Sequence, residues 1–243
     1  GALAGALAMY DLARPWLGPT GGLRAGFYLL IFPTGFFLAQ VYTEGLFVAL
    51  AFGSLAMARR GRWIVAAALA CLAAWTRVAG VLLVVPLGVA WLREGHWRRP
   101  FAGRAVARGL LALAPLGSHL VWRAVQGGPF GLVEQAMFAR GLLAVERSLE
   151  GWAGALRALR GRNPQAAAYY AVELGCVALA LASCLATIRR HADAAAFGLA
   201  VLVICIFSGV PVSMSRYALT VPSVYLLLAR LGGSPAFDRA WTL

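Results

Sequence analysis

Residues 63–92 read WIVAAALACLAAWTRVAGVLLVVPLGVAWL, and this apolar run decides the kind of fold that the chain can form. A single charge, Arg77, interrupts it. One unbroken helix over 63–92 would be about 45 Å long, whereas the hydrocarbon core of a membrane is about 30 Å thick. The run therefore predicts two short apolar helices that meet at Thr76 and Arg77.

The composition of the whole chain agrees with a membrane location. Of its 243 residues, 61% are apolar and 13% are charged, whereas soluble domains average about 45–50% apolar and about 25% charged residues. The mean hydropathy is +0.76. These values exclude a soluble enzyme, a disordered tail and a disulfide-stapled secreted domain, and they indicate a multi-pass membrane protein.

Apolar segments lie on both sides of this hairpin, so we expect an all-α, polytopic transmembrane bundle with about eight to nine membrane segments. They are 1–10, 25–40, 43–57, 63–76, 78–92, 105–124, 165–188, 194–209 and 217–230. Residues 11–24 contain Pro, Gly and Arg and are expected to form a loop. Several segments are shorter than a hydrocarbon core, which indicates a hollowed, watered cavity on one face.

We expect residues 1–243 to form one integral-membrane domain. The chain begins at Gly1 inside an apolar run, without the charged start or cleavage site of a signal peptide. We therefore expect a fragment whose upstream part is missing.

The charge is strongly basic, with 22 basic residues, all Arg, against 9 acidic ones. Because the Arg residues lie between apolar runs, they indicate membrane topology and no nucleic-acid partner. Their three groups are Arg59, Arg60 and Arg62; Arg93, Arg98, Arg99, Arg104 and Arg108; and Arg189 and Arg190. Counting segments places all three groups on one side, which the positive-inside rule makes cytoplasmic. The absence of Lys suggests a high-GC genome, so we expect a bacterial inner (plasma) membrane.

The other side receives the tips near 41–43, 77 and 210–216, and an external loop at 125–164. Within this loop, residues 145–160 carry apolar residues at helical spacing. They predict an amphipathic helix in the membrane interface, and a further role as a lid over a site remains open.

Polar residues mark the three tips, at Tyr42, Thr43 and Glu44, at Arg77, and at Ser215, Arg216 and Tyr217. In a structural interpretation, Thr43 caps the next helix, Glu44 lies at its positive end, and each Arg reaches the interface. In a functional interpretation, the tips face a substrate headgroup and the Arg residues bind a lipid phosphate. The functional interpretation is favoured because segment counting places all three tips on the same side.

Other candidates for chemistry are few. No metal-ligand cluster, nucleotide-binding motif or nucleophile motif is present, so no metal and no cofactor are expected. The four Cys residues and His119 lie in apolar runs and are interpreted as packing residues. Segment counting puts every Asp on the cytoplasmic side. The carboxylates that remain near the tips are Glu44, Glu134, Glu146 and Glu150.

Four stretches together resemble the PIG-V family of membrane mannosyltransferases, which includes GPI mannosyltransferase 2 and bacterial relatives. They are IFPTGFFLAQVYTEGLFVALAFGSL (31–55), WTRVAGVLLVVP (75–86), GGPFGLVEQAMFARG (127–141) and SMSRYALTVPSVYLLLA (213–229). They follow the family's order and cover most of the chain. The family's motif positions correspond to Tyr42, Thr43 and Glu44, to Arg77 and Gly80, and to Ser215, Arg216 and Tyr217. Val78 and Ala79 depart from a more polar pair that many members carry.

The resemblance implies a GT-C glycosyltransferase that moves a sugar, mannose in the family, from a polyprenyl-phosphate donor to a lipid or glycan acceptor at the extracytoplasmic face. It implies an acidic residue that acts as the catalytic base in a first external loop, upstream of Gly1. Within this chain, Glu44 is a weaker candidate for that base. We therefore expect this stretch to be inactive alone. A transporter or flippase for a lipid-linked substrate is the alternative, since short paired helices and intramembrane Arg suit it too. A non-catalytic scaffold subunit is a third.

Overall fold

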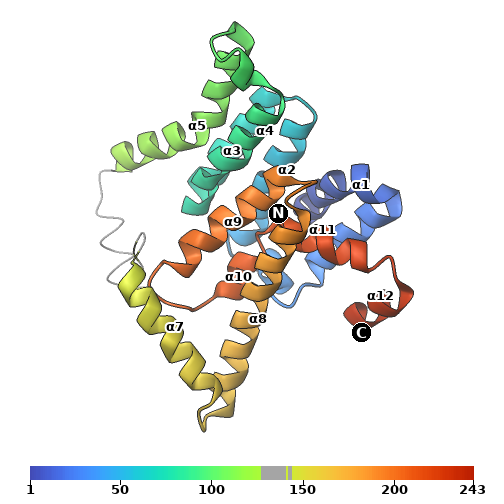
Figure 1. Ribbon diagram of the computed structural model, residues 1–243, viewed down its shortest axis with the longest axis vertical. Coiled ribbons are helices and arrows are strands. Elements are labelled where there is room, and N and C mark those ends of the chain that lie inside the picture. The colour runs from blue at the N-terminus through green and yellow to red at the C-terminus, as the bar shows by residue number, and fades with distance from the viewer. Residues whose placement is uncertain (127–140, 142–143) are drawn as a thin grey trace.

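The computed structural model describes residues 1–126, 141 and 144–243, and within these residues the chain is helical with no strand (Figure 1). The α-helices are α1 (Ala2–Leu30), α2 (Glu44–Arg59), α3 (Trp63–Thr76), α4 (Val84–Arg93), α5 (Gly103–Gln126), α7 (Val145–Leu159), α8 (Pro164–Thr187), α9 (Ala192–Ile206), α10 (Met214–Ala218), α11 (Pro222–Leu231) and α12 (Pro235–Thr242). Short 3-10 helices are η1 (Gly35–Leu38), η2 (Val78–Leu83) and η3 (His96–Arg98). The predicted all-α class is confirmed.

The predicted break in the run 63–92 is confirmed. Helix α3 ends at Thr76, Arg77 is extended (φ −150°, ψ 144°), and the chain returns through η2 into α4. Gly80 allows η2 to lie directly against the end of α3, because a Cβ at Gly80 would overlap the backbone of Ala73 and Ala74. The glycine of the Thr-Arg-x-x-Gly pattern therefore has a packing role here.

The loop predicted at 11–24 is wrong in its extent, because helix flanks a single non-helical residue inside this range. Residues Ala2–Leu30 are helical except for Gly18 (φ 71°, ψ −178°), which lies between Pro15 and Pro19 and breaks α1 into two halves. The second half folds back on the first, since a Cβ at Gly26 would lie 2.9 Å from the carbonyl oxygen of Ala6. Glycine adopts this conformation without strain, and a proline ring inside a helix prevents a backbone hydrogen bond. Gly18 and the flanking Pro residues thus turn the chain back on itself inside the range where the composition suggested an interruption.

Large apolar side chains from several helices form the core. Phe47 and Phe52 of α2, Phe197 of α9 and Tyr225 of α11 are fully buried. Each such side chain contributes roughly 1.5–3 kcal/mol by leaving water. The core thus joins the first helices of the chain to the last ones.

Two described helices are long and apolar enough to cross a membrane, over Gly103–Val125 in α5 and Pro164–Thr187 in α8. Four more are apolar but shorter, at Trp63–Thr76, Val78–Arg93, Ala192–Ile206 and Pro222–Leu231. Helix α5 buries only 22% of its most apolar stretch inside the protein, and Leu110 and Leu113 are exposed on it. A soluble protein would bury such a helix in its core. The exposed apolar face of α5 therefore suggests contact with lipid.

The amphipathic helix predicted at 145–160 is confirmed as α7 (Val145–Leu159). It meets α8 in a V-shaped pair that projects from the other helices (Figure 1). The Trp152 indole donates a hydrogen bond to the carbonyl oxygen of Ile206 (3.1 Å), while Leu149 and Leu156 are exposed. Helix α7 thus packs on the protein through Trp152, while other apolar side chains of the same helix stay exposed. Of the predicted external loop 125–164, residues 127–140 and 142–143 lie outside the described residues.

The Arg groups and the tips lie at opposite ends of the helices. At one end, Arg59 makes a two-pronged ion pair with Asp193 (2.6 and 2.9 Å), and Arg60 pairs with Asp11 (2.7 Å). Helices α2 and α3 run from this end to the tips at Glu44 and Arg77. The Arg groups and the tips are thus at opposite ends of the helices, as segment counting predicts.

Candidate functional site

Glu44, the first residue of α2, lies at the centre of the candidate site. Its side chain is 0% exposed, and its Oε1 atom accepts from two Arg residues. The Nη1 atom of Arg77 is 2.6 Å from Oε1, the Nε atom of Arg216 is 2.9 Å from it, and the Nη2 atom of Arg216 also contacts it. The structure therefore brings together one charged residue from each of the three predicted tips.

Aromatic rings surround the two guanidinium groups. Arg216 lies over Phe37 (4.5 Å to the ring centroid) and Tyr42 (4.9 Å), whereas Arg77 lies 5.9 Å from the ring centroid of Tyr217. Rings at these distances attract a cation through their negative faces. Tyr42 and Tyr217, both predicted site residues, thus take part in the site through their rings.

The charges of this cluster do not balance among its three members, since one carboxylate faces two guanidinium groups. The Arg77 side chain is 19% exposed and that of Arg216 is 26% exposed, so both can be reached from outside. Guanidinium groups bind phosphate and carboxylate oxygens in a forked geometry. The cluster can therefore accept an anion beside Glu44.

Thr43 does not perform the predicted capping role. It occupies the position before α2, but its side chain makes no capping hydrogen bond. Its backbone (φ −79°, ψ −9°) is already helical, whereas a capping side chain usually sits on extended backbone. Glu44 does lie in the first turn of α2, as the structural interpretation predicts.

Ser215 lies in the third tip but is directed away from the two Arg residues. Its N–H donates to Oε2 of Glu173 (2.7 Å), its hydroxyl donates to Oε1 of Glu173 (3.3 Å), and its carbonyl oxygen accepts from the Thr34 hydroxyl (3.1 Å). Nearby, Ser213 has a left-handed backbone (φ 62°) and donates its N–H to the Tyr169 hydroxyl (3.1 Å). Ser215 and its neighbours therefore hold the turn that presents Arg216.

Glu173 and Tyr169 are absent from the predicted set of site residues. Glu173 is buried in α8 and, among the described residues, forms no ion pair with Arg77 or Arg216. It lies about 14 Å along the helix from Pro164, so segment counting did not place it near a tip. Its signal in the sequence was a single acidic residue inside an apolar segment, which is costly without a partner. The prediction that named only Glu44, Glu134, Glu146 and Glu150 was therefore incomplete.

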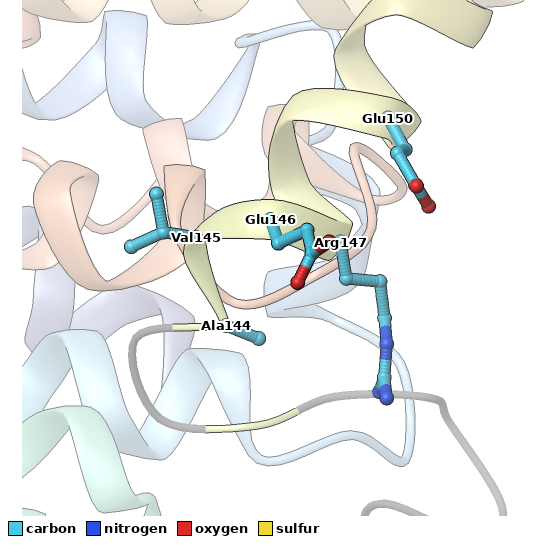
Figure 2. Close-up of a pocket in the computed structure, with 5 residues that line it drawn as sticks. All are labelled: Ala144, Val145, Glu146, Arg147 and Glu150. Atoms are coloured by element: carbon cyan, nitrogen blue, oxygen red, sulfur yellow. The ribbon is translucent and has the colours of Figure 1, made fainter.

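The other predicted carboxylates do not join the cluster. Glu146 and Glu150 line a cavity of about 400 Å³ at the start of α7, together with Ala144, Val145 and Arg147 (Figure 2). Glu134 lies outside the described residues. All three Asp residues pair with Arg elsewhere, and Asp238 does so with Arg24 (3.5 Å). Glu44 and Glu173 are thus the carboxylates that the described residues bring to the tips.

The remaining predicted packing residues take no part in the cluster. The His119 ring stacks on Trp122 (5.7 Å between centroids), and no disulfide joins any two of the four Cys residues. Within residues 1–126, 141 and 144–243, no group of three His, Cys, Asp or Glu residues could hold a metal ion.

Comparisons of the chain with models of known protein families, with curated proteins and with solved structures find no match. The resemblance described above therefore rests on the four quoted stretches.

Proposed function

We propose that this chain belongs to a membrane glycosyltransferase of the GT-C type, which moves a sugar, mannose by the resemblance, from a polyprenyl-phosphate donor to a lipid or glycan acceptor at the extracytoplasmic face. The observation that carries the proposal is the convergence of Arg77 and Arg216 on Glu44. These residues come from three of the stretches that resemble the family, and they meet at one end of the helices.

The chemistry of the transfer explains why two Arg residues suit this place. When the sugar leaves, negative charge grows on the donor phosphate, and a cation fixed beside that phosphate lowers the barrier. In the proposed site, Arg77 and Arg216 bind the phosphate through their exposed edges. Glu44 holds the two guanidinium groups close together, so they are already positioned before the donor binds.

Phe37, Tyr42 and Tyr217 support this role by their position. Their rings cover faces of the two guanidinium groups, which leaves the edges of the groups for hydrogen bonds. A guanidinium between rings is also held in one orientation, and orientation matters for a two-pronged contact with phosphate. The same rings offer an apolar surface to the start of a polyprenyl chain.

The test replaces each Arg by Lys in the full-length protein embedded in membranes, because this stretch is expected to be inactive alone. Lys keeps the charge but lacks the fork, so we expect Arg77→Lys and Arg216→Lys each to lower sugar transfer from a polyprenyl-phosphate donor by about 30- to 1000-fold, which corresponds to about 2–4 kcal/mol. Arg99→Lys, at the opposite end of the helices, is the matched control and should keep its rate. Transfer and the amount of folded protein are both measured.

Two results would contradict the proposal. Rates within about threefold of the unaltered protein in both Lys variants would mean that the Arg residues only reach the membrane interface. Movement of the donor across the bilayer without sugar transfer would favour the transporter or flippase alternative.

A further inference from the structure

A second basic pocket lies at the other end of α3 from the Glu44 cluster. It has a volume of about 440 Å³ and lies between the turn that precedes α3 and the first turns of α5. Arg62, Arg104 and Arg108 line it, one from the turn and two from α5. Because α3 runs the whole way between Arg62 and Arg77, this pocket is separate from the candidate site.

The three Arg residues of the pocket differ in their partners. Arg108 contacts Glu94, which also accepts a hydrogen bond from the Trp63 indole (3.2 Å). Arg62 and Arg104 are exposed, and neither forms an ion pair with another described residue. Two cations therefore face the pocket without a carboxylate to neutralise them, beside a third that Glu94 holds in place.

Apolar side chains continue the pocket along the helices. Ile64, Val65 and Leu111 line it together with the Arg residues. Ile64 is 74% exposed and Val65 is 45% exposed, so these side chains are left uncovered by the protein. Ile64 and Val65 lie on α3, and Leu111 lies on α5, which is long and apolar enough to cross a membrane.

We propose that this pocket binds an anionic phospholipid, with the headgroup phosphate on Arg62 and Arg104 and an acyl chain along Ile64, Val65 and Leu111. Basic pockets between membrane helices are suited to anionic headgroups, because the phosphate neutralises charges that the fold leaves unpaired. A free phosphate ion would use the Arg residues but not the apolar side chains. A phospholipid uses both halves of the pocket.

The position of the pocket agrees with this ligand. It lies at the Arg-rich end of the helices, where a headgroup and the first carbons of an acyl chain would stand if α5 crosses the membrane. The N-terminal turn of α3 begins at Trp63, so the positive end of that helix points to the same place.

The test measures lipid binding by the purified chain in a neutral detergent. Native mass spectrometry would count bound phosphatidylglycerol, with phosphatidylcholine of the same acyl chains for comparison and inorganic phosphate as competitor. We expect phosphatidylglycerol to bind more tightly than phosphatidylcholine. The double variant Arg62→Gln/Arg104→Gln should weaken phosphatidylglycerol binding about tenfold or more.

The double variant Arg98→Gln/Arg99→Gln is the matched control, since it removes the same charge from the same end of the protein and neither residue lines the pocket. It should bind phosphatidylglycerol within about twofold of the unaltered chain. An equal loss in both double variants would overturn the proposal in favour of general surface charge. Full displacement of the lipid by inorganic phosphate would overturn it in favour of a free-anion site.

A third arm tests the apolar half of the pocket. Ile64→Ser should weaken phosphatidylglycerol binding and leave inorganic phosphate binding unchanged, because it alters only the surface for the acyl chain. Unchanged lipid binding in this variant would contradict the placement of the chain along α3. None of these measurements depends on sugar transfer, so their failure is distinct from a failure of the proposed glycosyltransferase activity.

Discussion

Arg216 donates from Nε to Oε1 of Glu44 at 2.9 Å, although 172 residues of chain separate them. Arg77 donates to the same oxygen, while Oε2 of Glu44 is buried and has no hydrogen-bond partner among the described residues. One carboxylate oxygen therefore holds two guanidinium groups. The arrangement depends on the negative charge of Glu44 more than on its shape.

Glu44→Gln tests this dependence. The variant keeps the size of the side chain but leaves two Arg residues facing a neutral amide, and breaking a buried charge cluster costs about 3–5 kcal/mol. We expect a clear drop in thermal stability in detergent. Glu146→Gln changes an exposed carboxylate on α7 and should stay within about 0.5 kcal/mol. Equal stability of the two variants would show that the Arg residues do not need the charge of Glu44.

Glu173→Ala and Ser215→Ala separate two ways of holding the third tip. Loss of Glu173 leaves the buried N–H of Ser215 without its acceptor at 2.7 Å, which costs about 1–3 kcal/mol. Ser215→Ala removes only the longer hydroxyl contact of 3.3 Å and should cost less. Chemical denaturation of the two variants gives the order, and a larger loss in Ser215→Ala would contradict it.

Gly80→Ala tests the close approach of η2 to α3. The new Cβ would overlap the backbone of Ala73 and Ala74, so we expect a loss of about 1–3 kcal/mol and a weaker candidate site. Gly88→Ala in α4 is the matched control, because its Cβ meets open space. It should be neutral or stabilising by up to about 1 kcal/mol, since Ala favours helix over Gly. Thermal unfolding of both variants compares them directly.

The stability of the folded chain should depend on pH through His191. Burial, and next the positive charge of Arg59, lower the pKa of His191 from 6.5 to about 4. The folded chain keeps this ring neutral where the unfolded chain would protonate it. The resulting penalty is absent above about pH 6.5 and grows as the pH falls toward 4. The melting temperature should therefore fall from pH 7.5 to pH 5 in the unaltered chain, and fall less in His191→Gln. An equal fall of the melting temperature in the unaltered chain and in His191→Gln would contradict a role of His191.

The two ends of the helices should face opposite sides of a membrane. In a variant without the four native Cys residues, a Cys at Gln165 should react with an impermeant thiol reagent in intact cells. A Cys at Arg99 should react only after the cells are opened. Both positions are exposed, so access depends on the side of the membrane. Reaction at Arg99 alone in intact cells would reverse the predicted orientation.

Local pattern in the sequence was sufficient for features that depend on neighbouring residues. A single charge in an apolar run located the turn at Arg77, and the spacing of Leu149, Trp152 and Leu156 located α7. The Pro and Gly composition of 11–24 indicated the interruption at Gly18 but not the helix on either side of it, because one residue in a non-helical conformation is enough to turn the chain.

The sequence was less informative about contacts between distant segments. It placed Glu44, Arg77 and Arg216 at one end by counting segments, but it could not show that Glu44 itself would satisfy both Arg residues. It also missed Glu173, since its link to Ser215 depends on how α10 packs against α8. Such contacts follow from tertiary packing, which the local spacing of apolar residues does not predict.

If the chain crosses a membrane, the pairing of Glu44 with Arg77 also bears on its assembly there. Both residues belong to the hairpin of α2 and α3, so this hairpin carries its own counter-ion and has no net charge at its inner contact. It can enter the bilayer during synthesis without exposing a lone charge to lipid, which would be expensive. Arg216 emerges from the ribosome much later and joins a pair that is already neutral. The order of synthesis thus adds the surplus positive charge last, after most of the helices that shield it have been made.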